Sequence, residues 1–404
     1  MRTAPLASLA ALVVAGVTAL GTAPAASAGP SDPWVYSWGH NASGQLGNGS
    51  TTNATTPGQV LGLARQDVKS ISTGGVQTNT NSFTVALLKN GTVKSWGNSQ
   101  YGQLGNGTTT TATATQNVPG SVAGLTGVRA VDAGCFHGVA LRNGRVWTWG
   151  RNDNGQLGNG QPFPTTGNPP AELTAATVPA EVQSLDHVKA IAAGCLFTVA
   201  LREDGTVWTW GSNSSGQLGN GTNTRANTPQ KVEGLNDVEA IDAGHAHAVA
   251  VTKDHKVMAW GQNTHGELGV DNLVNSNKPV EVKHLTSVAR IIAGPYNTFA
   301  LLADGTVKAW GWNDKGQLGE NTFTDRTTPH LAPALAGARE ISPGYKHTLA
   351  VLEDQSVIAL GSNDQGQLGN GTTTDSPLPV TALPPGSGVV HVAGGTTTPV
   401  SFAY

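Results

Sequence analysis

Short apolar runs alternate with glycine-rich and polar turns along almost the whole chain, and the same order of runs returns every 50 to 61 residues. One copy is apolar over 188–194, over 197–203 and again over 206–211, with Asp204-Gly205 between the last two runs. Apolar runs of this length bounded by turn residues predict β-strands, and an Asp-Gly pair is a hairpin signal. Each copy therefore begins with three antiparallel strands.

A fourth strand completes each copy. After the third run a G-Q-L-G-N-G segment turns the chain, and a proline-containing strand such as 228–235 follows, which suits an edge strand because proline has no N–H to donate. The strands carry apolar residues on both faces, as expected for a sheet packed between two neighbouring sheets. Each copy therefore predicts one four-stranded blade.

The W-G or L-G pair that ends each third strand shows that there are seven copies. Its glycine is Gly39, Gly97, Gly150, Gly211, Gly261, Gly311 and Gly361. Seven blades closed into a ring leave only short sheet edges, and 53 glycines with 12% charged residues fit a turn-rich β protein. We therefore predict an all-β, seven-bladed β-propeller. Residues 34–39 form a third strand and 389–404 supply a first and a second, so pairing of the N- and C-terminal strands should close the ring.

The first 28 residues differ from the rest. Arg2, an apolar stretch over 6–20 and Ala26-Ser27-Ala28 match the three parts of a secretory signal peptide. We expect residues 1–28 to be that peptide, 29–404 to be the propeller, and the mature chain to be secreted; a retained N-terminal anchor is the alternative. No later stretch approaches 18 apolar residues, so no membrane span is expected.

The charge and the motifs of the chain reduce the number of functions that the sequence supports. A formal net charge of −3, with no Lys/Arg run longer than two, disfavours nucleic acid and anionic lipid as partners. The chain has no H-E-x-x-H, G-x-S-x-G or C-x-x-C motif, and its G-Q-L-G loops lack the Lys-Ser/Thr of a phosphate loop and the bidentate Glu of a calcium loop. We interpret these loops as architecture, and we predict no catalytic residue, metal or cofactor. A protein, cell-wall or other extracellular ligand, bound by a monomer, is the expected partner.

Candidate binding residues lie at the bend that follows each A-G or P-G pair, where the first strand turns into the second. These bends should gather at one mouth of the central channel. His137, His247 and His347 recur at one repeat position, where the ordinary role of the imidazole is a hydrogen bond within the blade.

Residues that depart from the repeat are stronger candidates for binding: His245, Tyr296, Tyr345 and Lys346. Trp312 is a further candidate contact residue, expected to be exposed, because the other copies have His, Asn, Arg, Ser or Gln at its position; an apolar surface residue without a contact role is the alternative. Insertions at 161–177 and 108–115 lengthen two loops after the G-Q-L-G turn. They are interpreted as tolerated surface loops, with Phe163 as a partner anchor in the alternative interpretation.

The chain's only two cysteines, Cys135 and Cys195, follow the A-G pair of successive copies. Equivalent bends on an inner ring of about 7 Å radius lie roughly 6 Å apart, which suits a disulfide, and an exported chain matures in an oxidising compartment. We predict a Cys135–Cys195 disulfide, with two buried thiols or a soft-metal pair as alternatives. The spacing of His245 and His247 also suits zinc, but it is as common in packed strands, and no metal site is predicted.

The full repeat pattern, seen over 133–158 as AGCFHGVALRNGRVWTWGRNDNGQLG, resembles the repeat of the regulator of chromosome condensation family. The match runs from 34 to 404 and implies a seven-bladed β-propeller. It implies less about activity, because members include nuclear exchange factors for a small GTPase, plant light sensors, parts of ubiquitin ligases and secreted bacterial inhibitors of β-lactamases. The tryptophan-arginine run of the light sensors is absent, with Trp147 and Trp208 on the third strands instead.

We therefore expect a secreted bacterial member of this family that acts as a non-enzymatic binding scaffold. One face of the propeller would engage a protein or cell-envelope partner. One alternative is an enzyme whose active site lies at the channel mouth and acts on a glycan or peptide. Another is a protein that resembles the β-lactamase inhibitors.

Overall fold

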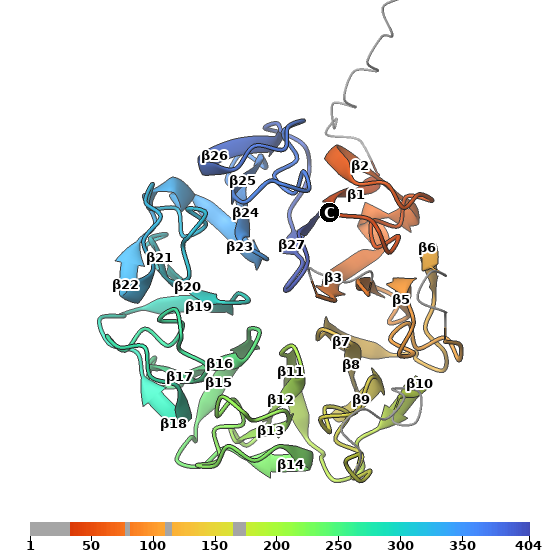
Figure 1. Cartoon of the computed structure of the whole chain (residues 1–404), viewed down its shortest axis with the longest axis vertical. Coiled ribbons are helices and arrows are strands. Elements are labelled where there is room, and N and C mark those ends of the chain that lie inside the picture. The colour runs from red at the N-terminus through yellow and green to blue at the C-terminus, as the bar shows by residue number, and fades with distance from the viewer. Residues whose placement is uncertain (1–32, 77–80, 110–114, 165–174) are drawn as a thin grey trace, which may run out of the picture.

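The computed structural model describes residues 33–76, 81–109, 115–164 and 175–404, which form seven four-stranded antiparallel sheets around a central channel (Figure 1). Each sheet is one blade, and strands from all seven blades line the channel. The predicted all-β, seven-bladed propeller is confirmed.

Blades 1 to 6 follow the order of the chain. Blade 1 consists of β3 (Val68–Gly74), β4 (Phe83–Leu88), β5 (Val93–Asn98) and β6 (Thr115–Ser121), and blade 2 of β7 (Val128–Ala133), β8 (His137–Arg142), β9 (Arg145–Gly150) and β10 (Ala176–Glu181). Blade 3 consists of β11 (Val188–Ala193), β12 (Phe197–Arg202), β13 (Val207–Gly211) and β14 (Ala226–Lys231), and blade 4 of β15 (Val238–Ala243), β16 (His247–Thr252), β17 (Val257–Gly261) and β18 (Ser276–Glu281). Blade 5 consists of β19 (Val288–Ala293), β20 (Asn297–Leu302), β21 (Val307–Gly311) and β22 (Arg326–Leu331), and blade 6 of β23 (Ala338–Gly344), β24 (His347–Leu352), β25 (Val357–Gly361) and β26 (Ser376–Leu383).

Blade 7 closes the ring with strands from both ends of the described chain. Its order is β27 (Val392–Gly394), β28 (Val400–Ala403), β1 (Trp34–Gly39) and β2 (Ala54–Ala64). Tyr36 pairs with Ala403 across β1 and β28. The Ile71 N–H of blade 1 donates to the Tyr404 hydroxyl at 3.1 Å. The predicted closure by N- and C-terminal strands is therefore confirmed.

The W-G tryptophans join neighbouring blades. In six blades the indole N–H donates at 2.7 to 3.0 Å to the main-chain oxygen of the Gln or Glu in the preceding G-Q-L-G or G-E-L-G loop. The pairs are Trp38 with Gln367, Trp96 with Gln45, Trp149 with Gln103, Trp210 with Gln156, Trp260 with Gln217 and Trp310 with Glu267. Blade 6 has Leu360 at this position, so the contact between blades 5 and 6 lacks the indole bond.

The G-Q-L-G loops are built around buried polar and apolar contacts. Asn213 Oδ1 accepts the Leu218 N–H at 2.9 Å, and Leu218 is fully buried between blades 3 and 4. Gly211 has φ +111°, and a Cβ there would lie 2.5 Å from the Leu196 carbonyl oxygen, so only glycine fits. The loops therefore hold adjacent blades together, as the sequence indicates.

Over the described ranges, the structure contains no helix with the length and apolar character needed to cross a membrane. The 3-10 turns η1 (Arg65–Asp67) and η3 (Pro333–Leu335) lie between strands. The expected signal peptide, residues 1–28, lies outside the described residues.

Candidate functional site at one mouth of the channel

The bends between first and second strands are tied to one another through the main chain. The Cys135 N–H donates to the Cys195 carbonyl at 2.9 Å, and the Cys195 N–H donates to that of His245 at 3.0 Å. The His245 N–H donates in turn to the Pro295 carbonyl at 3.0 Å. Proline has no N–H, so this series of hydrogen bonds stops between blades 5 and 6. It continues from blade 6 to blade 7, where the Tyr345 N–H donates to the Gly395 carbonyl at 2.9 Å.

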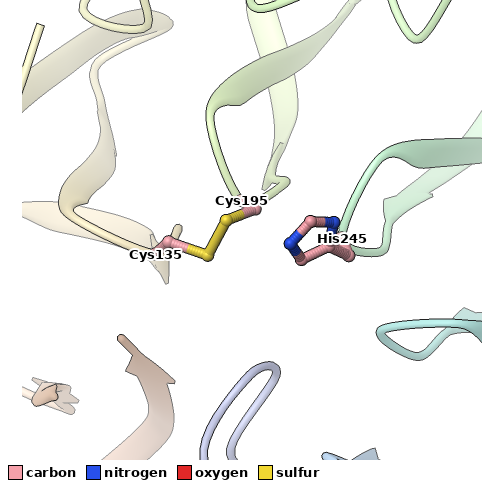
Figure 2. A group of neighbouring side chains, drawn as sticks. All are labelled: Cys135, Cys195 and His245. Atoms are coloured by element: carbon pink, nitrogen blue, oxygen red, sulfur yellow. A yellow bond between two sulfur atoms is a disulfide. The ribbon is translucent and has the colours of Figure 1, made fainter. Parts of the chain in front are cut away.

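The predicted disulfide joins Cys135 and Cys195, whose Cα atoms are 4.4 Å apart. This separation is shorter than the expected value of roughly 6 Å and lies at the short end of the range found in disulfides. Both cysteines are buried against Phe136 and Leu196. Figure 2 shows the disulfide beside His245, whose ring turns one nitrogen toward it. In this structure neither cysteine is a free thiol.

Six side chains from blades 4 to 6 gather at the same mouth, and we call this group the aromatic surface: His245, His265, Tyr296, Trp312, Tyr345 and Lys346. The His245 and Tyr296 rings stack with centroids 4.9 Å apart. The Trp312 ring meets the edge of Tyr296 at 5.3 Å and lies 6.3 Å from Tyr345. Three bends and two loops therefore contribute to one continuous group of rings.

An ion pair and a histidine–carboxylate hydrogen bond hold the outer members of the aromatic surface. Lys346 Nζ lies 3.9 Å from the Trp312 ring centroid and 2.8 Å from the Asp314 carboxylate. His265 stacks on Trp312 at 4.8 Å, and its Nδ1 lies 2.9 Å from the Asp325 carboxylate. Trp312, expected to be an exposed contact residue, is therefore half-buried between Lys346 and His265. The rings are fixed before any ligand arrives.

Burial sets the protonation of this surface. It lowers the pKa of His245 to about 4, so the imidazole is neutral at pH 7. It also raises the pKa of Tyr296 to about 12, and burial raises the pKa of Tyr345 as well. At neutral pH these three side chains offer uncharged rings and polar tips, which suits recognition more than proton transfer.

The repeat histidines have a different role from the one expected. The structure buries His137, His247 and His347 completely. Their Nε2 atoms bond the next blade, to Thr198 at 3.1 Å, Thr298 at 3.1 Å and Ser401 at 2.9 Å. The expected hydrogen bond within the blade is wrong for His137 and His247, whose bonded Nε2 points into the contact between blades. His347 makes both bonds, because its Nδ1 also lies 3.1 Å from the Tyr345 carbonyl of its own blade. Burial lowers the pKa of His137 and of His247 to about 3, and that of His347 to about 4.

The sequence interpretation missed two features. His265 stands in a loop position that varies between copies, and only the fold places its ring on Trp312, in the next blade. The channel carboxylates Asp132 and Asp242 were also missed. They line a cavity of about 270 Å³ and accept main-chain N–H groups of the next blade, from Ala193 at 2.8 Å and Ala293 at 2.9 Å.

These channel carboxylates are explained by architecture. Burial raises the pKa of Asp132, and it raises that of Asp242 to about 7. Asp132 also accepts the Ser72 hydroxyl of blade 1 at 2.7 Å, so its oxygens bond three blades.

Phe163, the alternative anchor, lies under the Arg225 guanidinium, whose central carbon is 4.0 Å from the ring centroid. Residues 165–174 of its insertion lie outside the described residues. Its role as a partner anchor stays a prediction.

The fold and this mouth define a class of protein: a β-propeller assembled from one repeat, with a preformed surface of rings on one face. Comparison with known protein families supports this class. The family described as the RCC1-like domain matches residues 142–403, and the regulator of chromosome condensation (RCC1) repeat matches 34–78 and 90–141. The chain belongs to the RCC1-like family.

Curated relatives share less than half of the chain. It is 33% identical to the human E3 ubiquitin-protein ligase HERC2 over 197 residues, which are 46% of this chain and 4% of that protein. It is 33% identical to the ultraviolet-B receptor UVR8 of Arabidopsis thaliana over 196 residues, which are 47% of this chain and 40% of the receptor. The chain therefore spans well under half the length of these relatives.

Solved structures share the whole fold. Prp20p of Saccharomyces cerevisiae, described with its binding to Gsp1p and histones, superposes with a TM-score of 0.77 at 22% identity, over 92% of this chain and 90% of that one. Human WBSCR16 superposes with a TM-score of 0.74 at 22% identity, over 92% of this chain and 98% of that one. At these identities the likeness shows the fold alone.

Proposed function

We propose that this chain is a non-enzymatic binding scaffold that engages a protein partner through the aromatic surface. The observation that carries the proposal is the gathering of preformed Tyr, Trp and His rings at one channel mouth. Tyr and Trp dominate the energetics of protein interfaces, and rings already fixed in place lose little entropy on binding. Prp20p, a propeller of the same fold, is described as binding other proteins.

Charge suggests the chemistry of the partner. Asp314 and Asp325 border the rings, and the Trp312 face with the Asp314 carboxylate already accommodates one ammonium group, that of Lys346. A partner segment that presents an apolar or aromatic side chain beside Lys or Arg matches this surface. A basic partner side chain would compete with Lys346 for Trp312.

Export is part of the proposal, since residues 1–28 match a secretory signal peptide. The partner would then be extracellular or in the cell envelope. Intact-mass analysis of the chain recovered from culture medium should place its N-terminus at Gly29. A chain that keeps residues 1–28 in the cell membrane would support the retained anchor instead.

Two matched tryptophan variants test the binding surface. Trp312→Ala removes the ring at the centre of the aromatic surface. Trp208→Ala removes a half-buried ring at the far end of blade 3, where its indole donates to the Thr206 hydroxyl at 3.1 Å. The immobilised mature chain should recover a protein from the culture medium or envelope extract that the Trp208 variant retains and the Trp312 variant loses.

Three outcomes would contradict the proposal: no partner at micromolar concentration, equal recovery by both variants, or selective retention of a glycan instead of a protein. The enzyme alternative is tested with the same preparations. Turnover of a glycan or peptide that disappears in a combined His245, Tyr296 and Lys346 substitution would favour an active site at the mouth.

A further inference from the structure

Three metal-ligating side chains meet at the channel mouth beside the aromatic surface. Cys135, Cys195 and His245 occupy the same bend position in blades 2, 3 and 4. One ligand atom from each lies within 4.8 Å of the other two. Figure 2 shows the His245 ring with one nitrogen turned toward the sulfur atoms. Among the described residues, this is the one such group of three or more.

The main chain holds this triplet together independently of the disulfide. The Cys135 N–H donates to the Cys195 carbonyl at 2.9 Å, and the Cys195 N–H donates to the His245 carbonyl at 3.0 Å. Each bend is also anchored between two strands of its own blade. Breaking the sulfur–sulfur bond therefore leaves the three side chains at the same corner.

The surroundings suit a thiophilic ion. Cys135 is 2% exposed and Cys195 is 6% exposed, and Phe136 and Leu196 cover them. In Figure 2 the His245 nitrogen turned toward the sulfur atoms is Nε2, the ring nitrogen farther from Cβ, whereas Nδ1, which has no hydrogen-bond partner in the described part of the chain, faces away from them. Nε2 is therefore the nitrogen placed to bind an ion, and Nδ1 can carry the proton of the neutral ring.

We propose that Cys135, Cys195 and His245 form a Zn²⁺ site when the disulfide is reduced. A dithiol reductant supplies two electrons and two protons, so that it becomes a disulfide while the Cys135–Cys195 bond opens into two thiols. Zn²⁺ then displaces both thiol protons and binds two thiolates and one imidazole nitrogen. The disulfide and the metal are alternative links between the same blades.

The geometry requires only side-chain rotation. Zn–S bonds of about 2.3 Å and Zn–N bonds of about 2.0 Å place tetrahedral ligand atoms roughly 3.5 to 3.8 Å apart. The three side chains already bring their ligand atoms within 4.8 Å, and the sulfur atoms must separate after reduction. His245 is only partly buried, so the fourth position faces the mouth and takes water or a ligand atom.

Cobalt titration tests this proposal on the mature chain. Protein reduced with a dithiol and desalted without oxygen should bind one equivalent of Co²⁺, with thiolate-to-cobalt absorption in the near ultraviolet and tetrahedral bands in the visible. Zn²⁺ should displace the Co²⁺ and protect both cysteines from alkylation. The oxidised protein should show neither band.

Variants assign the ligands. Cys135→Ser should abolish the thiolate bands. His245→Ala should weaken Co²⁺ binding by more than about tenfold, the least that even outer partners of zinc contribute. His255→Ala, at an exposed histidine in the blade 4 hairpin, is the matched control and should bind as the parent does.

Far-ultraviolet circular dichroism should show the same β-sheet content in the reduced parent and in every variant. Reduced, folded parent protein without thiolate bands would overturn the proposal. So would a His245→Ala variant with undiminished affinity.

Discussion

The channel mouth has two unlike halves. Across blades 2 to 4 the bends are joined by a disulfide and by consecutive main-chain hydrogen bonds. Pro295 interrupts that series between blades 5 and 6, and the rings of the aromatic surface meet across this contact. The comparison indicates that the bends bind one another wherever each supplies an N–H, and that side-chain rings make the contact where proline removes it.

Removing the disulfide should have the largest effect of these changes. The effect should be limited to the stability of the fold. The bridge links residues 60 positions apart. The chain-entropy model gives such a link about 4 kcal/mol of stability. Denaturant unfolding of Cys135→Ala/Cys195→Ala should show this loss, while partner binding by the aromatic surface persists. If binding falls with stability intact, the two halves are not separable.

Acid should weaken both halves alike. The repeat histidines are neutral when folded, with pKa values of about 3 to 4, whereas an unfolded imidazole titrates near 6.5. Between pH 6.5 and 4 the unfolded chain therefore binds protons that the folded chain does not, and stability falls as pH falls, by up to about 1.4 kcal/mol per pH unit for each histidine.

Asp132 and Asp242 act in the opposite sense. Because burial raises their pKa values, the folded chain holds protons that the unfolded chain has lost, and their contribution to stability falls as pH rises toward 7. The buried histidines outnumber them. Thermal unfolding measured between pH 4 and 7 should show that the free energy of unfolding falls as the pH falls. This loss of stability should be smaller than in the parent, and to a similar extent, in His137→Gln and His347→Gln. A reduction in only one variant would mean that the halves differ in burial.

Lys346→Met should have a smaller effect, restricted to the aromatic half. It removes the ammonium from the Trp312 face and from Asp314, which together are worth about 1 kcal/mol at a partly exposed site. Trp312 fluorescence should change, because the ring loses its covering cation. Basic partner segments should bind more tightly, since Trp312 becomes free; weaker binding would show that Lys346 itself contacts the partner.

Pro295→Ala is the smallest change and the most direct test of the comparison. It restores an N–H that can reach the Tyr345 carbonyl, as the equivalent N–H groups reach theirs. In the parent chain His347 Nδ1 is hydrogen-bonded to this carbonyl at 3.1 Å. In contrast, Nδ1 of His137 and of His247 has no hydrogen-bond partner in the described residues. Stability should change by less than about 1 kcal/mol. Nitrogen NMR should show the His347 proton leaving Nδ1; an unchanged tautomer would contradict this account.

Most of the fold was predictable because each blade repeats the same strand pattern. The same repetition predicted that Cys135 and Cys195 are neighbours. It also showed that Tyr296 and Tyr345 differ from the residues at the equivalent positions of other copies. The contacts that depend on two blades at once were not predictable. The stacking of His265 on Trp312 and the inter-blade bond of His137 both follow from side-chain direction across a contact, which no periodicity encodes.

The contact between blades 5 and 6 makes the ring mechanically uneven. It lacks both the indole bond, since Leu360 replaces tryptophan, and the bend-to-bend N–H bond, since Pro295 interrupts it. A side-chain bond from Thr348 to the Gln317 carbonyl and the Lys346–Asp314 ion pair still cross this contact, but with two main links missing we expect the ring to open here first. Trp312 and Tyr345 lie on either side of this contact, with ring centroids 6.3 Å apart. A slight widening there alters the gap between the two rings, while the other contacts between blades keep the remaining blades in place.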